Sequence, residues 1–423
     1  MFALVDCNNF FVSCERALDS DLIDKPVVVL SNNDGCIISR SEEAKALGIP
    51  MGAPTFKYEK FFQENNVIAL SAKFELYNFR SQNVMAIIKK YAPETEVYSI
   101  DEAFLNLSGF RYINIIEHSI KLKQDVLDTE GIPVSVGIAP TKTLSKIANR
   151  IAKKNPAKFE GLFILEKPED IEKALKWLNI EDVWGIGRRL GARMKDAGIY
   201  KAYDLLSKPE QWIRKEMGIN GVRLVNELKG IPQLEIPNTS SKKSIAVTRS
   251  FMEMIKTKEE LQERICSFAF SAGEKLRKQK SCCKVLTVFV GTNRYRKDLP
   301  EYKNAVSFHF PNPVSSSIDL AKTAAKLLDE IFIEGYHYKR AGVWINDFVP
   351  ENERLISLFE EDHFDRHKNI MEAMDKLNRR YGKDKIRLGN LDFKSNYGRK
   401  KLSTNYEDFL KNNTLPEADY RFQ

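Results

Sequence analysis

Two adjacent carboxylates, Asp101 and Glu102, interrupt the run "VYSIDEAFLNL" at residues 97–107, which otherwise has the apolar and β-branched character of a strand. Adjacent residues in a regular strand point to opposite faces, so both side chains can serve one site only if the backbone turns there. The flanking runs "EVYSI" and "AFLNL" therefore predict a hairpin with both carboxylates at its turn. The first strand-like run, "MFALVD", also stops at a carboxylate, Asp6, which we expect beside this turn.

Three carboxylates at the rim of one sheet restrict what the site can hold. Anions this close together repel one another and must be protonated or neutralised by cations. Their hard oxygen atoms suit Mg²⁺, and two such ions can clamp the attacking and leaving oxygens of a phosphoryl transfer. The alternative is a polar hairpin tip that only caps two strands, which a lone Asp-Glu pair would favour.

The charge balance favours an anionic partner, because 66 Lys and Arg against 58 Asp and Glu give the 423 residues a net charge of +8. Nucleic acid is the first expectation and an acidic membrane surface the second. The six cysteines include no C-x-x-C pair, which argues against a zinc framework and a thioredoxin-type redox site. The N-terminus has no basic region followed by a long apolar one, and no long apolar run occurs elsewhere, so we expect a cytoplasmic protein without membrane contact.

Strands and helices alternate in the first part of the chain. The stretch "PVVVLSNNDGCIISR" predicts two strands around an Asp-Gly turn, and the helix "SEEAKALG" that follows ends at Gly48. A further helix is predicted at residues 141–154. Its apolar face is formed by Leu144, Ile147, Ala148 and Ile151. Another side is cationic, with Lys142, Lys146, Arg150 and Lys153.

The second part of the chain predicts a separate α+β unit. From residue 166 to about 230 the pattern is helical with repeated glycines, and "PQLEIPNTSSKKS" is typical of a linker. Strand-like runs then alternate with two long helices, and both α+β units fit a β-α-β-β-α-β plan. Beyond Pro350 we expect a polar, irregular segment. His363 and His367 are four residues apart there, but no third ligand completes a zinc pattern.

Several motifs resemble those of the Y-family translesion DNA polymerases: "LVDCNNFFVSCE", "YSIDEAF", "SVGIAPTKTLSKIAN" and "VWGIGRRL". The stretches "LSNNDGCIISRSEEAKALGIPMGAP" and "AGVWINDFVP" are similar to the UmuC-like catalytic subunits of bacterial DNA polymerase V. The motifs follow the expected order, and the resemblance covers residues 1–350 closely and the tail loosely. It implies an error-prone, template-directed DNA polymerase of the SOS response that acts with a UmuD-like partner.

The resemblance also implies an α+β multidomain, right-hand-like fold. Its expected parts are a ferredoxin-like palm at 1–21 and 73–165, small fingers at 22–72, a helical thumb with a helix-hairpin-helix at 166–235, an α+β little finger at 236–350, and a C-terminal tail with a clamp-binding-like segment at 351–423.

Motif matching assigns the site residues that the resemblance implies. The metal-binding carboxylates are Asp6, Asp101 and Glu102, and the Cys7 carbonyl completes the shell of one of two Mg²⁺ ions. Phe11 matches a steric gate that leaves no room for the 2′-hydroxyl of a ribose, so that a deoxynucleoside triphosphate (dNTP) is the substrate. The implied nucleotide-binding residues are Phe10, Phe11, Ser39, Arg40, Lys45 and Lys153.

Glu42 departs from the family pattern, because many relatives carry Tyr at this position. An anion cannot bind a phosphate, so this contact is lost or passes to Arg40. The spacing Ser39-x-x-Glu42 equally fits a capping box at the start of the following helix, and this alternative stays open for Ser39.

Two further groups of residues match positions that contact DNA. They are Gly185, Gly187, Arg188 and Arg189 in the helix-hairpin-helix, and Thr248, Arg249 and Ser250 in the little finger. Such backbone contacts position DNA without reading its sequence. Leu190 breaks the dinucleotide-binding pattern G-x-G-x-x-G, and no G-x-x-x-x-G-K-[ST] occurs, which argues against an ATPase.

The segment "LISLF" resembles a sliding-clamp-binding motif formed by Leu355, Leu358 and Phe359, with Leu355 where the family usually has Gln. The partners that the resemblance implies are primer-template DNA, a processed UmuD-like dimer, the RecA filament and the sliding clamp, in a cytoplasmic, nucleoid-associated setting. Two other functions stay open. One is a palm-type nucleotide cyclase, against which the DNA-contacting motifs argue, and the other is a non-catalytic DNA-binding accessory, against which the intact carboxylates argue.

Overall fold

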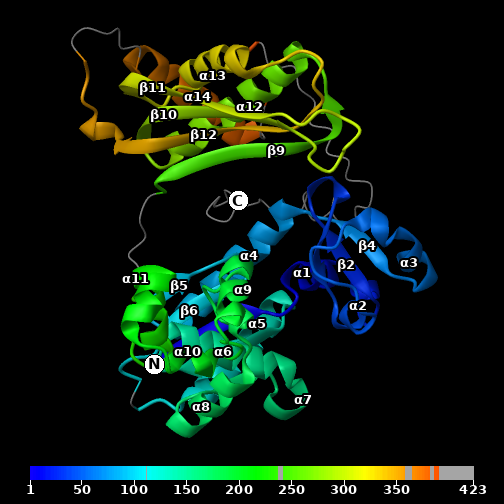
Figure 1. Cartoon of the computed structure of the whole chain (residues 1–423), viewed down its shortest axis with the longest axis vertical. Coiled ribbons are helices and arrows are strands. Elements are labelled where there is room, and N and C mark those ends of the chain that lie inside the picture. Colours follow the sequence, from blue (N-terminus) through cyan, green and yellow to red (C-terminus); the bar gives the residue numbers. More distant parts are fainter. Residues whose placement is uncertain (111, 237–241, 358–363, 382–384, 390–423) are drawn as a thin grey trace. The chain divides into compact units, whose positions relative to one another are not determined.

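The structure, a computed structural model, describes residues 1–110, 112–236, 242–357, 364–381 and 385–389. These residues form two units, one up to residue 236 and the other from residue 242 onward. Figure 1 shows both, coloured along the sequence. Each unit has its own sheets and hydrophobic core, so each is described by itself.

A five-stranded sheet with the order β5-β6-β1-β7-β8 lies at the centre of the first unit. Its strands are β1 (Phe2–Cys7), β5 (Thr95–Val97), β6 (Glu102–Asn106), β7 (Val134–Ala139) and β8 (Leu162–Ile164). β1 pairs antiparallel with both β6 and β7. The predicted hairpin is confirmed, since β5 and β6 pair antiparallel across a turn at residues 98–101.

Helices cover both faces of this sheet. Ala3, Val5 and Cys7 of β1 belong to a core shared with helices α1 (Phe10–Leu18), α4 (Phe74–Ile88) and α5 (Ile115–Glu130). The opposite face carries α6 (Lys142–Lys154). α6 lies so close to β7 that a Cβ atom at Gly137 would be 2.1 Å from the Asn149 nitrogen, a separation that only glycine avoids.

A smaller sheet with the order β3-β2-β4 has a core of its own. Its elements are β2 (Val27–Leu30), β3 (Ile37–Arg40), β4 (Ile68–Ser71), α2 (Glu42–Ala46) and α3 (Glu59–Glu64). β2 and β3 pair antiparallel, as predicted, but a 3-10 turn at Asn32–Asp34 joins them and not a two-residue turn. Gly48 follows α2 with φ of +77°, which agrees with the predicted helix end.

The one-turn helix α7 (Pro156–Phe159) lies between α6 and β8. The helices that follow β8, in the region of repeated glycines, are α8 (Pro168–Trp177), α9 (Arg188–Asp196), α10 (Ala202–Leu206) and α11 (Glu210–Leu228). Their apolar side chains share a core with Leu144, Ile147 and Ala148 of α6. The predicted apolar face of α6 is therefore confirmed.

The second unit has the β-α-β-β-α-β plan that its sequence predicts. Its elements are β9 (Ser244–Ile255), α12 (Lys258–Lys278), β10 (Ser281–Thr292), β11 (Lys303–Val314), α13 (Ser317–Ile331) and β12 (Tyr338–Pro350). The strands form one sheet in the order β11-β10-β12-β9. In Figure 1, α12 and α13 lie on one face of this sheet.

The prediction of an irregular segment beyond Pro350 is wrong in part, because residues Phe364–Tyr381 form the helix α14. Met371 and Met374 of α14 are buried in the core of the second unit. Asp375 accepts two hydrogen bonds from the Arg277 guanidinium of α12, at 2.8 and 2.7 Å. The core of this unit thus continues past the predicted boundary at residue 350.

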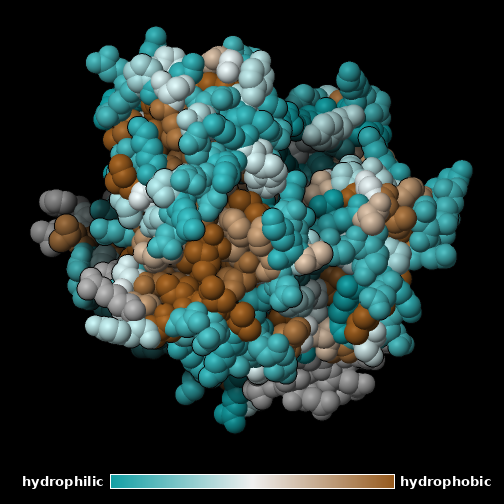
Figure 2. Space-filling model, turned by 90° about the horizontal axis from the view of Figure 1, so that it is seen from below, coloured by the Kyte–Doolittle hydropathy of each residue, from teal (hydrophilic) through white to brown (hydrophobic). Residues whose placement is uncertain are grey.

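No helix in the described part of the chain is long and apolar enough to cross a membrane. Figure 2 shows one face of the molecule, on which hydrophilic side chains surround a central area of apolar ones.

Candidate active site

Asp6 and Glu102 face each other on adjacent strands at one end of the five-stranded sheet. Asp6 lies near the end of β1, Glu102 begins β6, and the two residues are direct partners in the antiparallel register. Side chains at paired positions share a face of the sheet, so both carboxylates lie on the face that α6 covers. Ser135 of β7 pairs with Asp6 on its other side and continues the polar row.

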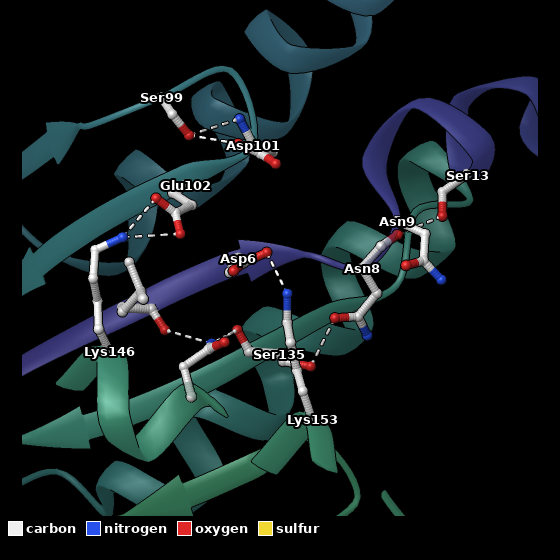
Figure 3. A network of polar contacts seen from close by, with 12 residues as sticks. Asp6, Asn8, Asn9, Ser13, Ser99, Asp101, Glu102, Ser135, Lys146 and Lys153 are labelled. Atoms are coloured by element: carbon white, nitrogen blue, oxygen red, sulfur yellow. Dashed lines mark hydrogen bonds and ion pairs between the residues drawn. The ribbon is translucent and has the colours of Figure 1, made fainter. Parts of the chain in front are cut away.

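Asp101 belongs to the turn that precedes Glu102. The Glu102 carbonyl accepts hydrogen bonds from the backbone amides of Tyr98 and Ser99, at 3.0 and 3.1 Å, which closes the turn. The Asp101 carbonyl accepts a bond from the Cys7 amide at 2.9 Å, so the turn is tied to β1. The Asp101 carboxylate accepts a 2.5 Å bond from the Ser99 hydroxyl (Figure 3).

The backbone therefore brings the three predicted acidic residues together, while their side chains do not close around one point. Within the described residues, no three His, Cys, Asp or Glu side chains lie close enough to hold one metal ion. Figure 3 shows Glu102 directed at Lys146 and Asp6 at Lys153, with Asp101 beside Ser99.

Lysines of α6 neutralise two of these carboxylates. Lys153 Nζ lies 2.5 Å from Asp6 Oδ1, and Lys146 Nζ lies 2.8 and 3.0 Å from the two Glu102 oxygens. The other members of the predicted cationic side also have carboxylate partners. Lys142 pairs with Glu96, and Arg150 with Asp182. Lys142, Lys146 and Lys153 thus supply counter-ions to carboxylates of the sheet, and Arg150 to a carboxylate outside it.

Burial shifts the ionisation of the acidic cluster. Loss of hydration raises the pKa of Asp6 from its ordinary 3.8 to about 6, Lys153 opposes the shift, and the negative charges of Glu102 and Asp101 add to it. Burial also raises the pKa of Asp101, against the hydrogen bond from Ser99. The anionic forms of both groups are therefore costly here, which favours a bound cation.

Three aromatic rings surround the Lys146 ammonium group. Its nitrogen lies 4.6 Å from the ring centre of Tyr98, 5.2 Å from Trp184 and 5.7 Å from Phe104. The Trp184 indole donates a 3.1 Å hydrogen bond to the Tyr98 hydroxyl. Because ring faces attract cations, this cage holds Lys146 against Glu102. It also connects the segment before α9 to the acidic turn.

Phe10 and Phe11 begin α1 and have different environments. Phe10 is 3% exposed and belongs to the core, as expected for a packing residue. Phe11 is half-buried, and its ring stacks on Tyr77 with centroids 4.6 Å apart and an interplanar angle of 21°. Phe74 meets both rings edge-on at 6.0 Å.

A broad cleft of about 1880 Å³ carries Asp6, Arg40, Lys45, Glu102 and Lys153 on its walls. All five are positions that the sequence analysis assigns to metal or nucleotide binding. Lys45 is held in place by Glu42 and Asn9. Its ammonium donates to Glu42 Oε1 at 2.7 Å and to Asn9 Oδ1 at 2.5 Å. The Arg40 guanidinium donates to the Ile49 carbonyl at 2.5 Å.

Ser39 is not the helix cap that one alternative predicted. The side chain of Ser41 caps α2 by accepting a hydrogen bond from the Ala44 amide at 3.2 Å. Ser39 instead lies in β3, is 5% exposed, and has its hydroxyl 3.4 Å from the Asn9 carbonyl. The spacing to Glu42 misled because two serines precede the helix within three residues.

The residues expected to contact DNA lie on the surface. Gly185 and Gly187 are exposed in the turn that leads into α9, where Gly185 has φ of +91°, and Arg188 and Arg189 are exposed at the start of that helix. In the other unit, Thr248 and Ser250 are exposed on β9, the edge strand of its sheet, and Arg249 between them is half-buried. The two groups occupy separate units, each with its own core.

The clamp-binding-like segment is described only at its start. Leu355 is 82% exposed, while Leu358 and Phe359 lie outside the described residues. His363 also lies outside them, and the ring of His367 is 3.1 Å from the Asp319 carboxylate.

Sequence reasoning missed the aromatic side chains that hold Lys146 and Phe11 in place. The cage around Lys146 draws on Tyr98, Phe104 and Trp184, and the support of Phe11 draws on Phe74 and Tyr77. In the sequence none of these aromatics stands out within its own segment, so the only available signal was the i, i+3 spacing of Phe74 and Tyr77.

The sequence matches two models of the impB/mucB/samB family, the family model over residues 5–150 and its C-terminal domain over residues 242–358. Residues 368–406 match a domain of unknown function, DUF4113, which begins within α14. The first of these models matches part of the first unit, and the second matches most of the second unit.

Curated relatives cover nearly the whole chain. Protein UmuC of Salmonella typhimurium is 36% identical over 421 residues, which is 97% of this chain and 100% of that protein. Protein ImpB of Salmonella typhimurium is 37% identical over 392 residues, covering 91% and 92%. DNA polymerase IV 1 of Bacillus subtilis is 26% identical over 396 residues, covering 91% of each chain.

Solved structures of similar fold include DNA polymerases. A Y-family chimera of Dbh and Dpo4 aligns with a TM-score of 0.68 and 27% identity, over 83% of this chain and 100% of that one. An insertion ternary complex of Dbh DNA polymerase aligns with a TM-score of 0.56 and 26% identity, with the same coverage.

Proposed function

Because the chain belongs to the impB/mucB/samB family and is a UmuC-like Y-family DNA polymerase, we propose that it extends primers past damaged template bases by two-metal-ion nucleotidyl transfer. Its enzyme class is DNA-directed DNA polymerase. The observation that carries the mechanism is the pair Asp6 and Glu102, opposite each other on adjacent strands and each neutralised by a lysine. A nucleotide cyclase or a non-catalytic DNA-binding accessory would explain the similarity to these DNA polymerases less well.

The acidic cluster suits divalent cations in the type of donor atom it offers. Its oxygens are the hard ligands that Mg²⁺ prefers, and the cluster already attracts two cationic side chains. Asp6, Asp101, Glu102 and the Cys7 carbonyl are the groups that would hold two Mg²⁺ ions. Such ions would lower the pKa of a primer 3′-hydroxyl and offset the charge of the leaving pyrophosphate.

The chain's own cations and aromatics would bind and select the dNTP. Lys45, Arg40 and Lys153 are on the cleft wall and suit the triphosphate, so Lys153 would exchange Asp6 for a phosphate oxygen. Ser39 is buried against Asn9 and fits this role less well. Phe11 would exclude a ribose by its bulk, since a flat ring offers no partner to a 2′-hydroxyl.

The remaining assignments follow the family. We assign the five-stranded sheet to a palm at 1–21 and 73–165 and the small sheet to fingers at 22–72. The helices after β8 are assigned to a thumb at 166–235, and the second unit is assigned to a little finger. The exposed turn before α9 and the edge strand β9 suit backbone contacts with primer-template DNA. A UmuD-like dimer, the RecA filament and the sliding clamp are the proposed partners in an SOS response at the nucleoid.

Primer extension with Mg²⁺ and dNTPs on undamaged and abasic templates tests the proposal. The test protein is the full chain with a UmuD-like partner and RecA, and the variant is Asp101→Asn with Glu102→Gln, which keeps side-chain size. We expect bypass by the wild type and a loss of about 1000-fold or more in the variant, the order of a lost charge-stabilising group.

Glu96→Gln is the matched control. Glu96 lies in the same sheet and pairs with Lys142, one turn before Lys146 on α6, but lies outside the acidic turn. It should retain activity within about threefold. Extension that survives in the double variant would show that these carboxylates are not catalytic. A wild type that binds primer-template yet adds no nucleotide would favour the accessory function.

A further inference from the structure

A fully buried ion pair joins α1 and α4 next to Phe11. The side chains of Glu15 and Lys73 are both 0% exposed, and Lys73 Nζ donates to Glu15 Oε2 at 2.5 Å. The other Glu15 oxygen accepts a 2.6 Å hydrogen bond from the Tyr77 hydroxyl. Tyr77 is itself fully buried, so both ends of its side chain have fixed surroundings.

Tyr77 connects this ion pair to the ring of Phe11. Phe11 and Glu15 are four residues apart on α1 and therefore lie on one side of that helix. Tyr77 of α4 meets both, because its ring stacks on Phe11 at 4.6 Å and its hydroxyl binds Glu15. Phe74, one turn earlier on α4, is edge-on to Phe11 with an interplanar angle of 88°. The Phe11 ring is thereby held on two sides.

Stability alone does not account for a buried ion pair in this place. Removing two charges from water costs several kcal/mol each, and well-packed apolar residues of similar size often serve as well or better. What the pair adds is direction, since a hydroxyl bonded to a fixed carboxylate sets the long axis of the Tyr77 ring. Burial and the Glu15 charge raise the pKa of the Tyr77 phenol, so it remains a donor at neutral pH.

The same helix also reaches the acidic turn. Ser81, one turn after Tyr77 on α4, donates a 2.6 Å hydrogen bond to the Ile100 carbonyl, next to Asp101. α4 therefore contacts both the Phe11 ring and the backbone before the catalytic carboxylates. A shift of α4 at Tyr77 would therefore alter the distance between the Phe11 ring and the backbone at Ile100.

We propose that Tyr77, anchored by Glu15 and Lys73, is a positioning residue for sugar discrimination that holds the Phe11 ring where it excludes a ribonucleotide. This inference rests on the proposed function, in which Phe11 is the steric gate. It adds that the gate depends on the hydrogen bond between the Tyr77 hydroxyl and the Glu15 carboxylate. Phe11 alone therefore does not set the selectivity for the sugar.

The test compares single-nucleotide insertion of a dNTP and the matching ribonucleotide on one primer-template by the full chain. The readout is the ratio of the two kcat/KM values. Tyr77→Phe keeps the stacked ring and removes only the hydroxyl. We expect the ratio to fall about tenfold, through faster ribonucleotide insertion, while dNTP insertion stays within about threefold. A merely structural role would lower both rates together.

Tyr91→Phe is the matched control for the loss of a tyrosine hydroxyl bond. Tyr91 is 8% exposed and donates to the Asp125 carboxylate, away from Phe11. It should leave the ratio unchanged at a comparable loss of Tm. A triple variant, Glu15→Leu with Lys73→Met and Tyr77→Phe, removes the whole network without leaving a buried charge. It should show the same fall as Tyr77→Phe and covers the case in which the single variant does not fold.

Phe11→Ala separates failure of the inference from failure of the gate. If Phe11→Ala abolishes discrimination but Tyr77→Phe and the triple variant keep the wild-type ratio, the anchor is not a positioning device and the gate stands. If Phe11→Ala itself keeps the wild-type ratio, Phe11 is not the gate and both proposals are wrong.

Discussion

Replacing Asp6 by Asn is expected to stabilise the metal-free protein at neutral pH, although it should abolish catalysis. Burial, more than the neighbouring charges, raises the pKa of Asp6 from 3.8 to about 6 in the folded state. The unfolded chain therefore releases this proton more readily than the folded chain. The contribution of Asp6 to stability accordingly falls as pH rises from about 3.8 to about 6, and is constant above that range.

The pKa difference of about 2 pH units corresponds to about 3 kcal/mol, at about 1.4 kcal/mol per unit. Asn removes this penalty and leaves Lys153 without its partner, but Lys153 is 32% exposed and can be hydrated. We therefore expect Asp6→Asn to add about 1–3 kcal/mol to the free energy of unfolding at pH 7.5 and close to nothing at pH 4. Each kcal/mol should raise the Tm by about 2–4 °C.

Thermal unfolding in EDTA, followed by circular dichroism at several pH values between 4 and 8, measures this effect. Asp182→Asn is the control, because Asp182 pairs with Arg150 of the same helix at 2.7 Å and is 30% exposed. It should give no gain. If Asp6→Asn lowers the Tm at pH 7.5 by as much as Asp182→Asn does, the reasoning is refuted. The ion pair with Lys153 would then contribute more to stability than the burial of the Asp6 charge costs. Adding Mg²⁺ should stabilise the wild type more than Asp6→Asn.

Three further expectations concern other parts of the structure. Lys146→Met should leave Glu102 without its counter-ion and raise the Mg²⁺ affinity measured by titration calorimetry, whereas unchanged affinity would mean that the caged lysine does not compete with metal. Glu42→Ala should free Lys45 for the triphosphate and lower the KM for dNTP about threefold in steady-state insertion assays, and an unchanged KM would contradict this. Met371→Ala, which truncates a 1% exposed side chain of α14, should cost the second unit about 2–4 kcal/mol in urea unfolding, and a loss below about 1 kcal/mol would show that α14 is not part of its core.

Local patterns in the sequence were sufficient for most elements. The strand-like runs on both sides of Asp101 and Glu102 predicted the hairpin of β5 and β6, because strand propensity is visible in consecutive residues. The apolar spacing of α6 predicted its buried face in the same way. α14 was missed although His367, Met371, Met374 and Asn378 recur every three to four residues on its inner side, because its charged residues outnumber these and the stretch appears polar.

The choice between the two serines before α2 shows where local patterns stop. Both Ser39 and Ser41 precede acidic residues, and either could cap the helix on spacing alone. Pairing of β3 with β2 keeps Ser39 within the strand, so the cap falls to Ser41. Tertiary contacts thus decided a feature that local spacing left open.

The sequence by itself determined the kinds of residue available: acids at the ends of strands, a cationic side on one helix, and two phenylalanines at the start of another. Only the tertiary structure decided which of them meet. Lys153 and Asp6 are 147 residues apart, Lys146 and Glu102 are 44 apart, and Tyr77 and Glu15 are 62 apart. Periodicity reports the face of an element on which a side chain lies, but contacts across such separations depend on how closely the elements pack. At Gly137 the absence of a side chain lets α6 approach β7, and this brings its lysines to the carboxylates.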